Sequence, residues 1–309
     1  MLANIIKNIL LTYNKPLREI GRYIESKNDV SVVLFGDSVS KRIAREDRDK
    51  RTLQIIMEQE LSIRKISANY FSGKGFHLRL FMHFISAMRK NDKKPDLVVI
   101  PVNLRCFSPQ WMYHPRWQFE KDLRIFCKKF MIPYSRPIIK FPDTSDEYRK
   151  MPISCHGSNH STIGDFMKII KKKEGLDENE TLFRKQQLFI FHYLYKLSSD
   201  NDRLCSLDML IKENNFNLLL YFTPLNYSGG EALLGDAFSA SVEENKKFIM
   251  QTIARDQAVK NVVTKDYSKL FDAAYFFSEH DPTEHLNEAG RKKLSKLLTE
   301  EIEMIIGKT

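Results

Sequence analysis

Residues 31–40 read SVVLFGDSVS, and this stretch decides how the rest of the chain is interpreted. Residues 31–35 form a short run rich in apolar and β-branched side chains, which predicts a buried strand. The run stops at Gly36, and Asp37 and Ser38 follow at once. A serine that lies between a core strand and a helix presents its hydroxyl at the open edge of the sheet. Ser38 is therefore the first candidate nucleophile, although Asp37 or Ser38 could instead cap the next helix.

Two later segments repeat the pattern of an apolar run that ends in polar residues. Residues 96–102 (DLVVIPV) end at Asn103, and residues 217–222 (NLLLYF) end at Thr223. Continuous apolar runs are typical of parallel strands covered on both faces. Helical spacing over 77–89 and 241–259 lies between or after them. The sequence therefore predicts an α/β fold, a three-layer parallel sheet flanked by helices, with its ligand site at the carboxyl ends of the strands.

The domain organisation follows from where this regularity begins and where it breaks down. We expect an N-terminal helical extension over 1–30 and one α/β domain over 31–309, with 107–204 as an insertion or cap. The insertion follows the strand that ends at Asn103. Prolines punctuate its first half. Its segment 181–197 (TLFRKQQLFIFHYLYKL) is very apolar for a surface helix, so we expect it to pack on the core or to cover the site.

The composition excludes some classes of protein and leaves the partner open. Of the 309 residues, 42% are hydrophobic, which is enough for a large core. The net charge of +10 favours an anionic partner, although the basic residues are scattered and also fit a solvated surface. Since the chain shows no recognised nucleic-acid motif, we expect no nucleic-acid partner.

The sequence also bears on where the protein resides. It has no apolar run long enough to span a membrane, and its start lacks the small-residue cleavage site of a secretory signal. The widely spaced cysteines suggest reduced thiols, so we expect a cytoplasmic protein. Apolar residues at helical spacing in the first ten positions allow peripheral membrane contact, although packing on the domain is the simpler account.

A nucleophilic serine needs a histidine as its base, and eight histidines compete for this role. His285 in DPTEHLNEAG lies at the start of a predicted final helix over 282–306, and His280 is the reserve candidate. The others fall in helical patterns, in the insertion, or in a pair without a third ligand; they are His77, His83, His114, His156, His160 and His192. We therefore expect no metal site.

The base in turn needs an acid that orients it, and Asp281 is the nearest upstream aspartate. Residues 281–284 (DPTE) also match a helix start, with Asp281 as N-cap, Pro282 at the first helical position and Glu284 as the capping-box partner. Asp281 therefore either caps the helix, or caps it and orients His285.

These residues resemble the blocks of the SGNH/GDSL hydrolase superfamily, in the order that the family has them. FGDSVS is similar to the block that carries the nucleophile, here Ser38. Gly73 in YFSGKGF is similar to the glycine that supplies an oxyanion-hole N–H, with Gly75 as the alternative. Asn103 in IPVNLR resembles the asparagine that is the other oxyanion donor.

The last block of the family is matched by His285, with Asn287 two residues on and Gly290 five residues on. The family's acid usually stands three residues before the histidine, where this chain has Pro282. Asp281 is thus one residue out of place, and a backbone carbonyl or another carboxylate could orient His285 instead.

The resemblance implies a flavodoxin-like fold and a serine esterase or O-acyltransferase that works through an acyl-enzyme without a cofactor. By analogy we expect its substrate to be an acylated, O-acetylated carbohydrate or a lipid-linked glycan of a bacterial surface pathway. The aromatic segment 107–119 (FSPQWMYHPRWQF) could stack on sugar rings or simply pack, and basic residues beside it could attract an anionic group. The alternative is a catalytically inactive protein of the same fold that binds an anionic glycan.

Overall fold

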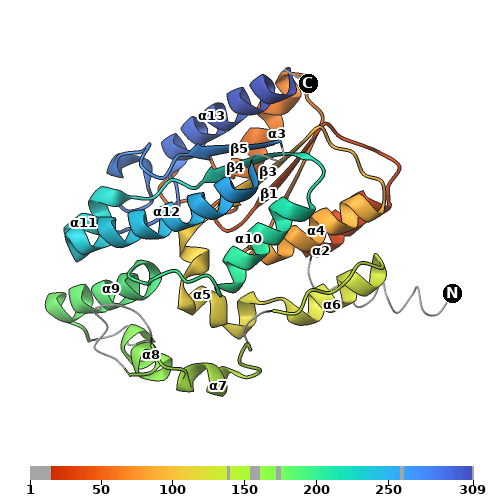
Figure 1. Cartoon of the computed structure of the whole chain (residues 1–309). Helices are drawn as coiled ribbons and strands as arrows, with labels where there is room; N and C mark the ends of the chain where they lie inside the picture. The colour runs from red at the N-terminus through yellow and green to blue at the C-terminus, as the bar shows by residue number, and fades with distance from the viewer. Residues whose placement is uncertain (1–14, 138–139, 154–160, 172–174, 258–260, 308–309) are drawn as a thin grey trace.

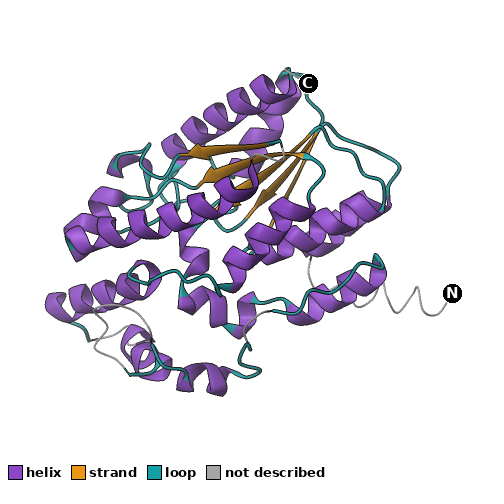
Figure 2. Cartoon of the chain, viewed as in Figure 1, coloured by secondary structure: helices purple, strands orange, loops and turns teal. Residues whose placement is uncertain are grey.

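The computed structural model describes residues 15–137, 140–153, 161–171, 175–257 and 261–307. Its centre is one parallel sheet of five strands in the order β2-β1-β3-β4-β5. Figure 2 shows this sheet between layers of helices. The strands are β1 (Val32–Gly36), β2 (Ala68–Ser72), β3 (Leu97–Val102), β4 (Asn217–Phe222) and β5 (Val262–Asp266). This order is that of flavodoxin-like doubly wound sheets. The predicted α/β fold with a parallel sheet is confirmed.

Helices cover both faces of the sheet (Figure 1). One face carries α3 (Leu53–Ile63) and α13 (Glu288–Ile306), which pack against each other. The other face carries α2 (Lys15–Glu25), α4 (Leu78–Lys90), α10 (Asp202–Glu213) and α12 (Asp236–Gln257). The short helix α11 (Tyr227–Leu234) follows β4 and packs on α12.

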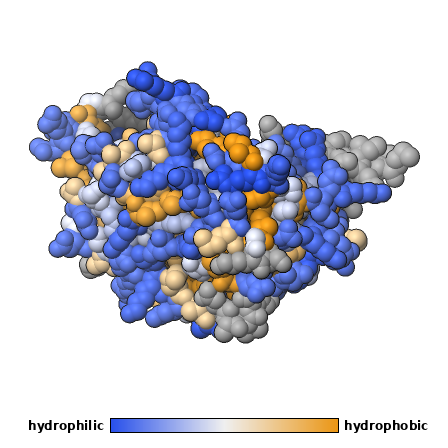
Figure 3. All heavy atoms as spheres, turned by 90° about the horizontal axis from the view of Figure 1, so that it is seen from above, coloured by the Kyte–Doolittle hydropathy of each residue, from blue (hydrophilic) through white to orange (hydrophobic). Residues whose placement is uncertain are grey.

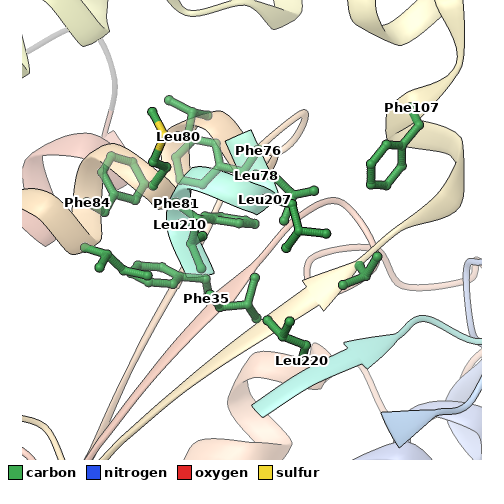
Figure 4. Close-up of a cluster of buried hydrophobic side chains, with 14 of the residues drawn as sticks. Phe35, Phe76, Leu78, Leu80, Phe81, Phe84, Phe107, Leu207, Leu210 and Leu220 are labelled. Carbon is green, nitrogen blue, oxygen red and sulfur yellow. The ribbon is translucent and has the colours of Figure 1, made fainter. Parts of the chain in front are cut away.

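Alternation along the strands divides the apolar core into two clusters. Val33 and Phe35 of β1 face α4 and α10, whereas Val32 and Leu34 face α3 and α13. Figure 4 shows Phe35 together with side chains of α4 and α10, including Phe81, on the first of these faces. Burying such a side chain stabilises the folded state by about 1.5–3 kcal/mol, so a strand that buries side chains on both faces contributes strongly to the stability of the fold. This is why the apolar runs alone predicted β1, β3 and β4.

The segment between β3 and α10 forms a further layer beyond α4, α10 and α12 in Figure 1. Its helices and 3-10 turns are η2 (Leu104–Phe107), α5 (Pro109–Tyr113), η3 (Pro115–Trp117), α6 (Glu120–Lys129), α7 (Ser145–Lys150), α8 (Ile163–Lys171) and α9 (Glu178–Tyr193). Asp177 and Glu180 form a capping box at the start of α9, which overlaps the apolar segment 181–197 of the sequence. The insertion expected over 107–204 corresponds in the structure to residues 104–201, between β3 and α10, and from here on the insertion means this range.

Part of the expected N-terminal extension lies in the described chain. Helix α2 buries Leu17, Ile20 and Ile24 completely or nearly so against the core. Residues 1–14, on which the expected membrane contact depends, lie outside the described residues. Within the described ranges no helix combines the length and the apolar character that crossing a bilayer requires. The face in Figure 3 is mainly hydrophilic, with apolar side chains in small scattered groups.

The predicted start of the final helix at Pro282 is wrong. Helix α13 begins at Glu288, and Asn287 is its N-cap, with the side-chain oxygen accepting the N–H of Gly290 at 3.1 Å. Residues 281–286 form a loop instead. Glu284 is not a capping partner because its carboxylate is buried in contacts with the insertion.

Candidate active site

Ser38 lies in a tight turn directly after β1, at the carboxyl edge of the sheet. Its carbonyl accepts the N–H groups of Lys41 (3.2 Å) and Arg42 (3.0 Å), and its side chain is mostly buried. The turn does not lead into a helix as expected, because α3 begins only at Leu53. Asp37 therefore caps the turn rather than a helix, its Oδ1 accepting the N–H of Val39 at 2.8 Å.

The loop before α13 brings His285 to the serine across 247 residues of chain. His285 Nε2 lies 3.2 Å from Ser38 Oγ. The other ring nitrogen, Nδ1, lies 3.3 Å from Thr283 Oγ1, which also accepts the backbone N–H of His285 at 3.1 Å. A proton on Nδ1 that points at Thr283 leaves Nε2 free to accept the serine proton.

The protonation of His285 is set by burial and by nearby charges. Burial is the main cause that lowers the pKa of His285, and Arg105 and Arg42 lower it too, whereas the Glu284 carboxylate raises it; the net result is a pKa of about 4. His285 is therefore neutral near pH 7, which is the form that a general base requires.

The carboxylate of Asp281 does not contact His285. Its Oδ1 pairs with Lys185 of α9 at 3.1 Å, on the surface of the molecule. The reserve base His280 lies in the same loop and is exposed. The structure thus brings Ser38 and His285 together and places Asp281 in a different contact.

Asn226, which sequence reasoning missed, holds the histidine loop in place. It follows β4 and is fully buried. Its side-chain amide donates to the carbonyls of Ser278 (3.0 Å), Glu279 (3.0 Å) and Asp281 (3.1 Å), and its backbone N–H donates to the carbonyl of Thr283 (3.0 Å). The one available signal was its position just after an apolar strand.

A second link ties the loop after Ser38 to the helix after His285. Arg291 is fully buried in α13 and pairs with Asp47 at 2.5 Å. Its guanidinium also donates to the carbonyls of Arg51 and Asp49 from the serine side and of Leu286 from the histidine side. The loop that follows Ser38 and the end of the loop that carries His285 are therefore joined through one buried cation.

Asn103, the candidate oxyanion donor from β3, points its amide at the same turn. Its Nδ2 donates to Asp37 Oδ2 at 2.7 Å, and its oxygen accepts the N–H of Arg105 at 3.1 Å. An amide nitrogen has two N–H groups, so one can point at substrate while Asp37 takes the other. Burial raises the pKa of Asp37 to about 6, against the lowering effect of these hydrogen bonds.

The glycine block after β2 differs in detail from the expectation. The N–H of Gly73 donates to the carbonyl of Gly36 at 3.2 Å, so it is engaged within the body of the fold. Gly75 has a φ of +78°, which favours glycine, and a Cβ there would lie 2.3 Å from the ring of Trp117. The insertion therefore packs directly on this loop.

The aromatic segment packs near the glycine block through Trp117 and near Arg105 through Trp111. The rings of Trp111 and Trp117 are stacked with centroids 5.2 Å apart, and Trp111 Nε1 donates to His192 Nδ1 at 3.3 Å. The Arg105 guanidinium lies 4.8 Å from the centroid of Trp111. Both tryptophans are half-buried and contact each other.

Metal ligation is not indicated in the part of the chain that the structure describes. No group of three or more potential ligands occurs there, and Cys106, Cys127 and Cys205 are free thiols. His156 and His160 lie outside the described residues.

Comparisons with known proteins identify similar solved structures. No family model matches the chain, and no curated protein matches it. A family two carbohydrate esterase from Clostridium thermocellum, solved with cellohexaose, is 11% identical; the match covers 91% of this chain and 66% of that one, with a TM-score of 0.41. The chain thus spans slightly less than two thirds of that protein.

Two further structures are covered over nearly their whole length. A GDSL-like lipase from Bacteroides thetaiotaomicron is 11% identical over 96% of this chain and 98% of that one, with a TM-score of 0.41. A family 3 carbohydrate esterase from Clostridium thermocellum is 10% identical over 90% and 98%, with a TM-score of 0.38. The family resemblance stated above is carried by the motif residues and by the parallel sheet that presents them. In both respects this chain resembles the SGNH/GDSL hydrolases.

Proposed function

We propose that the chain is a serine-dependent ester hydrolase or acyltransferase, with Ser38 as nucleophile and His285 as general base. The observation that carries the proposal is the 3.2 Å contact between Ser38 Oγ and His285 Nε2. Hydrogen-bond reach between a serine and a neutral histidine is the requirement for activating the hydroxyl. The fold places the pair at the carboxyl edge of a parallel sheet, where ligands of doubly wound proteins bind.

In the proposed reaction His285 takes the Ser38 proton as the serine oxygen attacks the ester carbonyl. The Asn103 amide and the backbone N–H of Ser38 stabilise the negative oxygen of the tetrahedral intermediate. Gly73 can join them when its N–H leaves the carbonyl of Gly36. The protonated His285 then gives its proton to the leaving oxygen, and the acyl group passes to water or to another hydroxyl.

We propose that the substrate is acylated and is either an O-acetylated carbohydrate or a lipid-linked glycan. The stacked Trp111 and Trp117 offer aromatic surface near Gly75 and Arg105, and such surface suits sugar rings. Arg42 on the turn after Ser38 is exposed and adds positive charge beside the site, which suits an anionic substrate. The cytoplasmic location and peripheral membrane contact expected from the sequence stay predictions.

The test is labelling by a fluorophosphonate probe, together with turnover of p-nitrophenyl acetate, in wild type and Ser38→Ala. Labelling of the wild type and not of Ser38→Ala is expected, and it would justify a screen of acetylated glycans in which deacetylation and transfer are measured separately.

A non-catalytic glycan-binding protein is the second candidate. It is favoured by two contacts, since Gly73 and Asn103 both donate to groups of the protein itself. If the folded wild type is not labelled and yet binds acetylated glycans in calorimetry, this second function replaces the first.

A further inference from the structure

The proposed base has no carboxylate on its Nδ1, yet a buried carboxylate lies next to it in sequence. Glu284 is 1% exposed, whereas the side chain of Asp281 is 21% exposed and pairs with an exposed lysine. Buried carboxylates are rare unless they are paired, because removal from water is costly. The burial of Glu284 therefore indicates that specific partners bind its carboxylate.

Two residues of the insertion hold the Glu284 carboxylate. Arg105 of η2 forms an ion pair with it, and the hydroxyl of Tyr193, in the last turn of α9, donates to Oε2 at 2.9 Å. Tyr193 is itself almost completely buried. Arg105 is held from its other side by the ring of Trp111. The carboxylate therefore lies between the Arg105 guanidinium and the Tyr193 hydroxyl.

The charge on Glu284 persists in spite of its burial. Burial raises its pKa, but Arg105, His285 and the Tyr193 hydroxyl lower it, and the net result is a pKa of about 2. A carboxylate that is ionised at neutral pH and adjacent to His285 would stabilise the imidazolium that forms in the proposed reaction. This is the electrostatic part of what an orienting acid supplies.

Helix α9 contacts the loop that carries His285 at two points. Lys185 meets Asp281 at one end of the loop, and Tyr193 meets Glu284 next to His285. The Lys185–Asp281 ion pair is exposed and contributes little to stability, whereas the Tyr193–Glu284 hydrogen bond is buried and charge-assisted. The position of His285 is thereby coupled to the insertion through Glu284.

We propose that Glu284, held by Arg105 and Tyr193 of the insertion, is the positioning residue of His285, and that Asp281 only anchors α9 to the loop. The inference rests on the proposed function, because it concerns the base of that reaction. The charged groups near His285 are Glu284 from its own loop, Arg105 from η2 and Arg42 from the serine turn. Removal of the Glu284 charge leaves the two arginines unopposed.

The experiment compares Glu284→Gln with Glu284→Asp and with Asp281→Asn as the matched control. For p-nitrophenyl acetate, kcat and KM are measured from about pH 3 to about pH 8 in brief assays, since the acid limb reports the base. Glu284→Gln is expected to lower kcat about tenfold or more with KM little changed. Its acid limb moves about one pH unit lower, because the negative charge that favours the imidazolium is gone.

The two companion variants separate charge from shape. Glu284→Asp keeps the charge, so its acid limb stays near that of wild type even if kcat falls. Asp281→Asn keeps both kcat and the acid limb of wild type. A wild-type pH profile in Glu284→Gln, or a loss of about a hundredfold or more in Asp281→Asn, would overturn the inference.

A second variant guards against misfolding of Glu284→Gln, which leaves Arg105 buried without its partner. Tyr193→Phe removes a single hydroxyl and is expected to lower kcat about fivefold without changing KM. Unchanged kcat in folded Tyr193→Phe would count against the proposed coupling to α9.

Failure of the proposed function would show itself differently. In that case the fluorophosphonate probe does not label wild-type Ser38. The titration of His285, followed by NMR and assigned with His285→Gln, still reports whether Glu284→Gln lowers the pKa of the histidine. A shift there supports the role of Glu284 in setting the histidine charge even in a protein without esterase activity, whereas no shift refutes it.

Discussion

The body of the fold and the insertion are held together by different forces. The body is organised by a two-faced apolar sheet, with Val33 and Val98 packed on one side and Leu34 and Val99 on the other. The insertion has apolar contacts too, but it is fixed to the body by buried arginines. Arg79 of α4 reaches Glu120 and Tyr134, and Arg203 reaches Gln118. Periodic apolar burial is visible in a sequence, whereas such polar links become visible only when the partners are placed.

The two regions also contribute differently to the site. Every group that we expect to touch the reacting atoms lies on a loop of the body: Ser38 after β1, Asn103 after β3 and His285 before α13. The insertion contributes the groups around them, namely Trp117 against Gly75 and Tyr193 against Glu284. Under the proposed function, the body would carry the reacting groups and the insertion would fix the groups around them.

The largest expected effect tests whether the chemistry belongs to the body. Ser38→Ala and His285→Gln should each lower kcat on p-nitrophenyl acetate by about ten thousandfold, and the double variant should be little worse, because the two groups act as one unit. Additive losses in the double variant would contradict the shared proton transfer.

Next comes a pair of variants that each remove one buried arginine of the body, of which Arg291 is paired within the body and Arg79 is paired with the insertion. Arg291→Met and Arg79→Met each leave a carboxylate without its buried partner, Asp47 in the body and Glu120 at the insertion. Each should lower the free energy of unfolding by about 3–5 kcal/mol. Denaturant unfolding measures this loss.

The catalytic activity of the same two variants should also differ. Arg291→Met should also lower kcat, since Arg291 joins the serine and histidine loops, whereas Arg79→Met should retain kcat under conditions in which it is folded. Equal kcat losses in the two variants would show that the insertion anchor is as important for the site as the body link.

A smaller loss is expected at Asn103. Asn103→Ala should lower kcat about a hundredfold to a thousandfold, because one oxyanion donor is removed. Asp37→Asn is the comparison, since it keeps a hydrogen-bonding side chain beside Asn103. Full activity of Asn103→Ala would remove Asn103 from the mechanism.

The pH dependence separates activity from stability. The lowered pKa of His285, about 4, keeps the base neutral, so kcat/KM should be flat from about pH 8 to about pH 5 and fall below that. The free energy of unfolding is expected to depend on pH over a different range. His83 and His285 have folded pKa values of about 4 and His192 of about 3, all below the ordinary 6.5. These three histidines therefore bind more protons in the unfolded chain, which outweighs the single opposite contribution of Asp37 with its pKa of about 6, and the free energy of unfolding should decrease as the pH falls from 6.5 towards 4.

Thermal unfolding monitored across that pH window checks the second half of this prediction. A stability that rises on acidification would mean that these histidines are not buried in neutral form. Activity that disappears near pH 6.5 would likewise contradict the burial of His285.

The smallest expected effect concerns the exposed ion pair between α9 and the loop that carries His285. Lys185→Met breaks an ion pair that is half exposed on the lysine side. Pairs of this kind contribute about 0.2–1 kcal/mol, so the unfolding free energy should change by no more than that. A larger loss would show that α9 depends on its exposed contact as much as on Tyr193.

Particular residues show how far the sequence could predict the fold. The runs over β1, β3 and β4 are continuous and apolar, and they gave the correct fold class. Strand β2 (ANYFS) is short and mixed in polarity, and β5 (VVTKD) is an edge strand that is only partly buried, so neither had the apolar signature. The start of α13 was misplaced because the DPTE pattern suits a helix cap locally, while burial of Glu284 imposes a loop.

The sequence by itself determined the fold class and the pairing of Ser38 with His285 as candidates, because strand burial and short motifs are local properties of the chain. Only the tertiary structure decided which groups surround that pair. Thr283 faces Nδ1, Asn226 holds the loop, and Glu284 meets Arg105 and Tyr193, contacts that join segments up to about 180 residues apart. Hydrogen bonds and ion pairs of this kind depend on distance and burial in space, and neither is encoded in the spacing of residues along the chain.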